Sequence, residues 1–197
     1  EAARALQLLA WTCSRLGDQD SARTHIDAAG ALAASGSDPW LVCKGHSVAG
    51  LLAHVAHDHA RAERELGMAI ALARPAGFHA TLAGALHGLA LVLKVQGRMA
   101  EAVPLLREAS AIQADRQVDM PILQYELARN LALLARHHEA EEALDRYRSA
   151  RGDDFYTLEA SAELAWHRGD ARDALSAARR AFEHFGEGRT DGELVLA

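Results

Sequence analysis

The sequence predicts an all-α protein, a right-handed α-solenoid of about five antiparallel helix hairpins, and two observations carry this prediction. Four short turn signatures recur at a near-constant spacing, which is typical of stacked repeats. Each signature separates two stretches whose apolar residues recur with the period of a helix. No stretch alternates with the period of a strand for long enough to predict a sheet. The signatures are Leu16-Gly17-Asp18, His57-Asp58-His59, Gln96-Gly97-Arg98 and Arg168-Gly169-Asp170.

The sequence around Gly97 shows the layout of one unit, which is helix, turn, helix. Glycine suits the turn because the residue that ends a helix often takes a left-handed backbone. An alanine five residues later, Ala102 in this unit, lets the second helix approach the first closely. The same alanine follows the other three signatures, at Ala22, Ala62 and Ala174. The apolar face of the helix before Gly97 is made of Leu82, Leu86, Leu89, Ala90 and Leu93, and that of the helix after it of Ala102, Leu105, Leu106 and Ala109.

Two turns are expected to form without glycine. His57 stands at the glycine position of the second turn, and histidine tolerates the left-handed region better than a branched residue does. A fourth unit with a weaker signature is expected to turn at His137-His138, and the sequence leaves its register undetermined by one residue. This unit places Ala143 on its second helix. The steps between turns are then 40, 40, 41 and 31 residues, so the first three are longer than the last.

Proline, glycine and aspartate mark the joints between units, as at Asp38-Pro39, Pro75-Ala76-Gly77, Asp119-Met120-Pro121 and Gly152-Asp153-Asp154. Asp38 is predicted to cap a helix with Pro39 at its first position. We therefore expect a single helical repeat domain over residues 1–197, with units at about 1–36, 38–76, 78–117, 120–151 and 154–186. Residues 190–197 are expected to start a further helix. The apolar end and the missing initiator methionine favour a fragment of a longer protein.

The composition limits the classes of partner. A net charge of −6 excludes a surface that binds nucleic acid throughout, because phosphate contacts need a positive field. No uncharged apolar run reaches ~18 residues and no signal peptide begins the chain, so we expect no membrane contact. Cys13 and Cys43 lack metal or redox spacing, which favours reduced cysteines in a cytoplasmic protein. Arginine far outnumbers lysine, which indicates, with the many alanines, a bacterial genome rich in GC.

No catalytic motif is present in the sequence. It lacks a glycine-rich phosphate loop, a Gly-x-Ser-x-Gly elbow and a His-Glu-x-x-His pair, so we predict no enzyme activity and no cofactor. A site assembled across repeats, with Cys13 or Cys43 as nucleophile, stays open as an alternative. His54 and His57 form an i, i+3 pair that could hold a metal. We predict no metal site, because no Cys or further acidic ligand has ligand spacing and a helix end itself favours histidine.

The units resemble tetratricopeptide repeats (TPRs). The small residues of the repeat's first helix match Ala10, Gly50, Ala90 and Ala162, and its turn glycines match Gly17, Gly97 and Gly169. The small residues of its second helix match Ala22, Ala62, Ala102, Ala143 and Ala174. The large residues of the second helix match Ile26, Leu66, Leu106 and Tyr147, and Ala178 departs from this pattern. The resemblance covers essentially the whole chain and implies a TPR-like superhelix. The lengthened step is similar to that of the repeat arrays in large bacterial LuxR-type and MalT-like transcription regulators.

The resemblance implies that the first helices line a concave groove and carry the contacts with a ligand. The groove-facing residues it implies are Arg4, Gln7, Trp11, Arg15, Lys44, Ser47, Leu51, His54, His87, Leu91, Lys94, Tyr125, Arg129, Tyr156, Glu159, Glu163 and Trp166. Both lysines of the chain lie in this set among aromatic residues, which suits an extended peptide or a small anionic effector. A solvent-exposed helix face with no binding role is the alternative. The chaperone-type clamp needs paired Lys and Asn, and Asn130 is the only asparagine, so that clamp is not supported.

Two functions are expected from the resemblance. The first is a non-catalytic scaffold for a protein, peptide or ligand, serving as the sensor and regulatory region of a bacterial transcription regulator. In that arrangement a neighbouring domain would contact nucleic acid, and this segment would not. The second is a free-standing TPR adaptor that assembles protein complexes. The identity of the partner and the oligomeric state are left open by the sequence.

Overall fold

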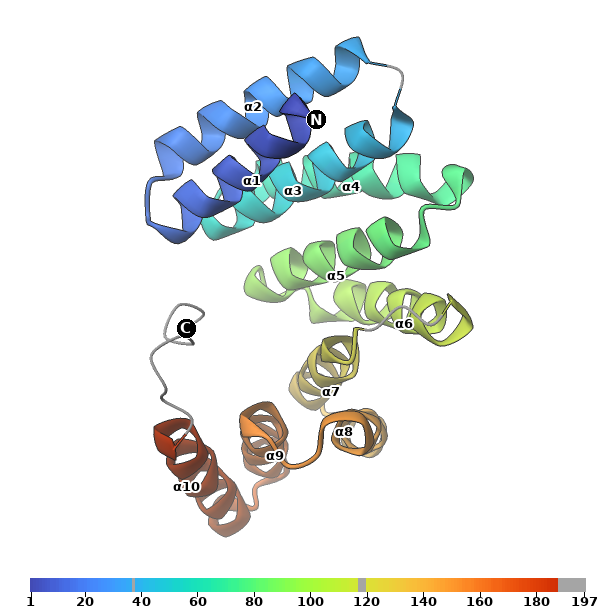
Figure 1. The fold of residues 1–197 in the computed structure, drawn as a ribbon. Coiled ribbons are helices and arrows are strands. Elements are labelled where there is room, and N and C mark those ends of the chain that lie inside the picture. The colour runs from blue at the N-terminus through green and yellow to red at the C-terminus, as the bar shows by residue number, and fades with distance from the viewer. Residues whose placement is uncertain (37, 117–119, 188–197) are drawn as a thin grey trace. The chain divides into compact units, whose positions relative to one another are not determined.

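A computed structural model of the protein describes residues 1–36, 38–116 and 120–187. These residues form ten α-helices and no strand (Figure 1). In chain order the helices are α1 (Ala2–Arg15), α2 (Gln19–Ser35), α3 (Pro39–Val55), α4 (His59–Ala76), α5 (His79–Val95), α6 (Met99–Arg116), α7 (Ile122–Leu133), α8 (His137–Arg151), α9 (Phe155–Arg168) and α10 (Ala171–Glu187). The prediction of an all-α fold is confirmed. Residues 190–197, where a further helix was expected, lie outside the described residues.

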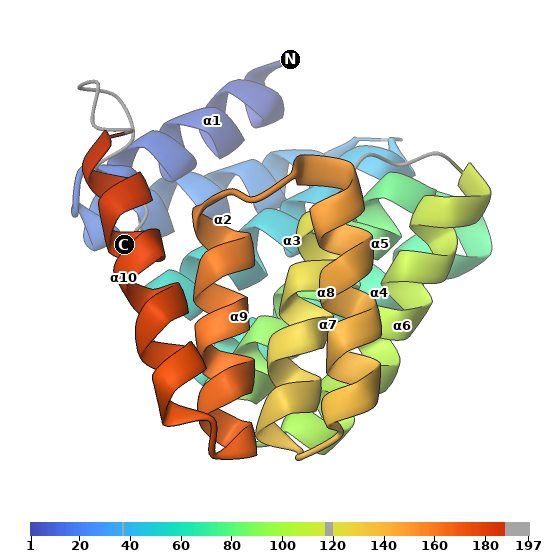
Figure 2. The same ribbon diagram turned by 90° about the horizontal axis from the view of Figure 1, so that it is seen from below.

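The helices belong to two compact units, and each is described by itself. The first unit comprises Glu1–Gly97 with Ala111–Val118, and the second Arg98–Ser110 with Asp119–Ala197. In the first unit α3 packs against α1 and α5, so these three helices form one layer, and α2 and α4 pack on that layer from the other side. In the second unit α7 packs on α9, while α8 contacts both and α10 packs on α9 (Figure 2).

The tight turns have the left-handed backbone that the sequence predicts. Gly17, Gly97 and Gly169 have φ angles of +84°, +77° and +86°, and His57 takes the same region at +59°. The first two turns are followed at once by an aspartate cap, since Asp18 and Asp58 each accept a hydrogen bond from the backbone N–H three residues later, at 3.0 Å. Each of these pairs of helices therefore closes by the mechanism expected from its turn signature.

The predicted position of the fourth turn is wrong. Its left-handed residue is Ala135, with a φ angle of +56°, whereas His137 is already the first residue of α8. The turn lies 38 residues after Gly97 and 34 before Gly169, so the repeat is more regular than the sequence indicated. An alanine carries this turn without the left-handed preference of glycine or asparagine, and its residue type therefore gave no signal.

The joints and the core agree with the sequence. Asp38 caps α3 by accepting hydrogen bonds from the backbone N–H groups of Trp40 at 3.1 Å and Leu41 at 3.3 Å, with Pro39 at the first helical position. The alanines expected to admit close helix packing are all buried: Ala22, Ala62, Ala102, Ala143 and Ala174. The large residues of the second helices are buried too, namely Ile26, Leu66, Leu106 and Tyr147, and Ala178 is exposed. Small residues thus bring the helices together and leucines fill the space between them.

Both cysteines are free thiols. Cys43 is buried and donates a hydrogen bond from Sγ to the carbonyl oxygen of Ala69 at 3.3 Å, and burial raises its pKa. A buried thiol with a raised pKa is suited to packing and poorly suited to nucleophilic attack. Among the residues that the structure describes, no helix has both the length and the apolar character needed to cross a bilayer.

Candidate functional site

The candidate site is the exposed face of the α1, α3 and α5 layer in the first unit. We call it the α1–α3–α5 surface and define it by Arg4, Trp11, Arg15, Lys44, Leu51, His54, His87, Leu91 and Lys94. Within each helix these residues recur at intervals of three, four or seven, so they share one face. All of them are exposed or half-buried, although two predicted neighbours, Gln7 and Ser47, are buried at 8% and 3% exposure.

The α1 end of this surface pairs a cation with an aromatic ring. The guanidinium carbon of Arg4 lies 4.9 Å from the centre of the Trp40 ring, on the first turn of α3. A cation over an indole face is attracted by the negative charge of the π system. Lys44 follows Trp40 by one turn of the same helix, and Trp11 is 39% exposed on α1. A ligand at this end would meet the Arg4 cation and the Trp40 ring, with Lys44 one turn further along α3.

The charge of this layer is one-sided. The sequences of α1, α3 and α5 contain no aspartate or glutamate, but they carry Arg4, Arg15, Lys44 and Lys94. The helices of the other layer mix both signs, with Asp20, Arg23 and Asp27 on α2 and Arg61, Glu63, Arg64, Glu65 and Arg74 on α4. The whole chain has a net charge of −6, so a layer with cations and no carboxylate differs in sign from the rest of the protein. A layer of this charge favours an anionic ligand.

Three histidines gather near the second turn. The ring of His59 lies 6.2 Å, centre to centre, from both His54 and His57. Burial is the main cause that lowers the pKa of His54, and His59, His57 and Lys94 lower it further. The folded protein therefore favours the neutral ring. Within the described part of the chain, no three His, Cys, Asp or Glu side chains lie close enough together to hold a metal ion.

In the second unit, five predicted groove residues from two helices meet in one cluster. Tyr125 of α7 donates a hydrogen bond to Glu159 of α9 at 2.5 Å, and Arg129 donates to the Tyr125 hydroxyl oxygen at 2.7 Å. Arg129 also holds Glu163 through two N–H groups, at 2.5 and 3.3 Å. The Tyr156 ring packs edge-on against Tyr125 at 5.2 Å. The cluster joins α7 to α9 through partners that are 34 residues apart in the chain.

The cluster holds its groups in fixed protonation states. Burial and then the hydrogen bond to Glu159 raise the pKa of Tyr125, so its hydroxyl stays protonated. Burial alone would lower the pKa of Arg129, but the hydrogen bond to Glu163 and the charges of Tyr125, Glu163 and Glu159 raise it. Tyr125 is only 3% exposed, whereas Tyr156 and Trp166 are 39% and 67% exposed. Phe182 of α10 is 78% exposed, so Tyr156, Trp166 and Phe182 all present aromatic rings to a partner in this unit.

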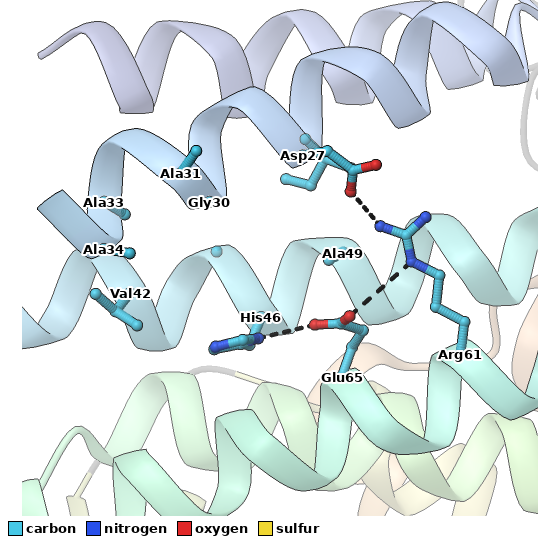
Figure 3. Close-up of a pocket in the computed structure, with 12 residues that line it drawn as sticks. Asp27, Gly30, Ala31, Ala33, Ala34, Val42, His46, Ala49, Arg61 and Glu65 are labelled. Atoms are coloured by element: carbon cyan, nitrogen blue, oxygen red, sulfur yellow. Dashed lines mark hydrogen bonds and ion pairs between the residues drawn. The ribbon is translucent and has the colours of Figure 1, made fainter.

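A second feature of the first unit was missed from the sequence. A pocket of about 260 Å³ lies between α2 and α4, with residues of α3 in its lining. Figure 3 shows a chain of polar contacts at one end of it, in which His46 meets Glu65 and Arg61 meets both Glu65 and Asp27. The signal in the sequence is the Ala-Ala-Gly-Ala-Leu-Ala-Ala run of α2, which has few side chains large enough to fill this space.

Comparisons with known proteins establish the fold. No protein-family model and no curated protein sequence matches the chain. A candidate kinesin light chain of Podospora anserina with nearly identical TPR-like repeats matches at TM-score 0.74 and 18% identity, over 95% of this chain and 96% of that one. A thermophilic TPR protein of Thermus thermophilus matches at TM-score 0.68 and 19% identity, over 95% and 93%. Aspartyl phosphate phosphatase F of Bacillus subtilis matches at TM-score 0.82 and 13% identity, over 94% of this chain and 49% of that one.

These structures share the fold of this chain at low identity. The predicted fold class, an α-solenoid of TPR-like helix hairpins, is therefore confirmed. Fold alone does not select a partner, and the partner has to be argued from the side chains of the surface.

Proposed function

We propose that this chain is a non-catalytic scaffold that binds an acidic segment of a protein or peptide on its α1–α3–α5 surface. The observation that carries the proposal is the charge of the layer, where three neighbouring helices carry four Lys or Arg residues and no carboxylate. A carboxylate that approaches this layer meets no repulsion from the helices that form it, and long-range attraction raises its association rate.

The shape of the surface supports a peptide. The α1–α3–α5 surface extends across three parallel rows of side chains and includes apolar groups, such as Leu51 and Leu91, between the cations. Arg4 is already placed over the Trp40 ring, so little side-chain entropy is lost when Arg4 binds a carboxylate. An extended segment with acidic and apolar residues would satisfy both kinds of contact.

At a finer level, we propose that the array is the regulatory region of a larger bacterial transcription regulator of the LuxR or MalT type. The support is the resemblance of the repeat and the bias toward arginine and alanine. In this arrangement the acidic segment is an effector whose binding controls a neighbouring domain. The gene that encodes the chain tests the arrangement: an ATPase or helix-turn-helix domain in the same reading frame supports it. A reading frame with no such domain supports the adaptor function instead.

Binding is tested with a fluorescein-labelled peptide of about 12 residues made of glutamate, leucine and serine. Lys44→Glu should weaken binding about tenfold, which corresponds to about 1.4 kcal/mol. Arg64→Glu is the matched control, because it makes the same change of charge at an exposed position of α4, away from the surface. Equal dissociation constants for the two variants, measured by fluorescence anisotropy, would refute the placement of the site.

A further inference from the structure

A groove runs along α3 on the side opposite to the α1–α3–α5 surface. Three pockets of about 200, 260 and 330 Å³ follow one another along α3. The first two lie between α2 and the first half of α4, and the third lies between Gly36, just after α2, and Leu72, near the end of α4. The first two share Ile26, Ala49 and Arg61 in their linings, and the last two share Val42. The pockets are therefore parts of one groove, which we call the α2–α4 groove, and its length is that of α3, 17 residues or ~25 Å.

The groove is hollow because its walls are made of small residues. The α2 wall includes Gly30, Ala31 and Ala34, and all three are exposed. A Cβ atom added at Gly30 would meet no atom within 4 Å, so the wall has open space in front of it. Small side chains of this kind let the ridge of another helix approach the backbone closely.

The groove is acidic. Its three pockets are lined by five carboxylates and two guanidinium groups, so the formal charge is negative at neutral pH. One exposed carboxylate is Asp27, whose side chain is 56% exposed although it is paired with Arg61 across the groove (Figure 3). Arg61 also reaches Glu65 at 4.0 Å, and Glu65 is held by His46 at 2.8 Å. If a cation of a ligand paired with Asp27 in place of Arg61, then Arg61 could still pair with the carboxylate of Glu65.

We propose that the α2–α4 groove binds a basic amphipathic helix of a partner protein. The apolar side chains of that helix enter the groove against Val42, Gly30 and Ala34, and a flanking lysine or arginine binds Asp27. The charge of the groove selects a basic partner, whereas the α1–α3–α5 surface on the other layer selects an acidic one. The two layers of the first unit therefore bind partners of opposite charge, and the second site does not depend on the first.

The probe is a fluorescein-labelled amphipathic peptide of about 15 residues made of leucine, alanine and lysine, long enough for about four helical turns. A peptide with glutamate in place of lysine is its control. Gly30→Leu places a large side chain in the groove from α2, and Ala34→Leu does the same one turn later. If one of these variants unfolds, the other can be used to block the groove. The matched control is Ala28→Leu, which adds a larger side chain at an exposed position of α2 that lines none of the three pockets.

Gly30→Leu should weaken binding of the lysine peptide at least about tenfold, while Ala28→Leu and Lys44→Glu leave its dissociation constant unchanged. The glutamate peptide should not bind the groove. Equal affinities for Gly30→Leu and Ala28→Leu would overturn the proposal. So would an equal loss of lysine-peptide and glutamate-peptide binding in Gly30→Leu, because the glutamate peptide would then occupy the groove as well. A dimer in light scattering that Gly30→Leu dissociates would overturn it in favour of a second copy as the occupant. Loss of acidic-peptide binding in Lys44→Glu leaves this proposal intact.

Discussion

Gly50 of α3 lies so close to Leu66 of α4 that a Cβ atom on residue 50 would be 2.5 Å from Leu66 Cγ. A Cβ on Gly88 of α5 would also meet Leu66, at 3.0 Å from its Cδ2. Leu66 is fully buried between these helices. The Leu66 side chain of α4 therefore packs against two glycines, Gly50 of α3 and Gly88 of α5. This contact sets how closely α3, α4 and α5 pack.

We expect Gly50→Ala to lower the free energy of unfolding by about 1–3 kcal/mol, because the added methyl group forces Leu66 out of its place. The comparison is Gly30→Ala, where the added Cβ meets nothing within 4 Å and a helical glycine is replaced by the best helix former. That variant should gain about 0.5–1 kcal/mol. Urea unfolding of the two variants measures both effects. A Gly50→Ala protein with the same free energy of unfolding as the wild type would contradict the packing described.

Asp154 is expected to be the costliest helix cap to remove. Its carboxylate accepts hydrogen bonds from the backbone N–H of Thr157 at 2.9 Å and from the Tyr147 hydroxyl at 2.8 Å, so it caps α9 and holds α8 at once. Asp154→Ala should cost about 2 kcal/mol, more than the ~1 kcal/mol of an ordinary cap. Asp18→Ala is the control, since its side chain only caps α2. Equal losses in thermal unfolding would show that the bond to Tyr147 adds nothing.

Stability should fall below about pH 6.5 because of His54. Burial first, and then His59, His57 and Lys94, lower the pKa of His54 in the folded protein. The unfolded chain therefore takes up this proton at a higher pH than the folded chain does. The stabilisation is complete above the unfolded pKa and is lost as the pH falls through the folded pKa.

His54→Gln should accordingly show a smaller loss of Tm than the wild type between about pH 7.5 and pH 5.5. The control is His138→Gln, which removes a histidine whose side chain is 83% exposed. If His54→Gln and the wild type lose the same number of degrees, the environment described for His54 is wrong.

Arg129 should contribute more to stability than an exposed arginine of the same unit. Arg129 is 24% exposed and binds both Tyr125 and Glu163, whereas Arg107 is 48% exposed and pairs with Glu139 alone. Arg129→Met should cost about 1–2 kcal/mol, because Glu163 loses its partner in a half-buried site and Tyr125 keeps only its hydrogen bond to Glu159. Arg107→Met should cost less than ~1 kcal/mol. Chemical unfolding distinguishes the two, and the reverse order would contradict the burial of the cluster.

Much of this fold could be predicted from the sequence because its signals are local. A glycine or histidine with a positive φ angle, an aspartate cap and an alanine on the next helix each act within six residues, as at Gly17, Asp18 and Ala22. The turn at Ala135 was misplaced because alanine has no left-handed preference that would mark it. Local signals therefore located the turns wherever the residue type itself favours the turn conformation.

The sequence predicted which residues of the candidate site face the same side, but it did not predict how deeply each of them is buried. The resemblance to tetratricopeptide repeats implied that Tyr125, Arg129, Tyr156 and Glu159 face the same groove, and the structure brings them together. Periodicity does not report how far a neighbouring helix covers a residue, which is why Gln7 and Ser47 proved to be buried. The α2–α4 groove depends on what is missing between two helices of different repeats, and no single helix sequence shows such a gap.

The most direct measurement is an NMR titration of the ¹⁵N-labelled protein with the glutamate-containing peptide, which reports the residues that contact it. We expect the largest chemical-shift changes at Arg4, Trp40, Lys44 and their neighbours on α1, α3 and α5. Changes confined to α2 and α4, or none at concentrations that saturate the fluorescence assay, would contradict the assignment of the α1–α3–α5 surface as the site for an acidic partner.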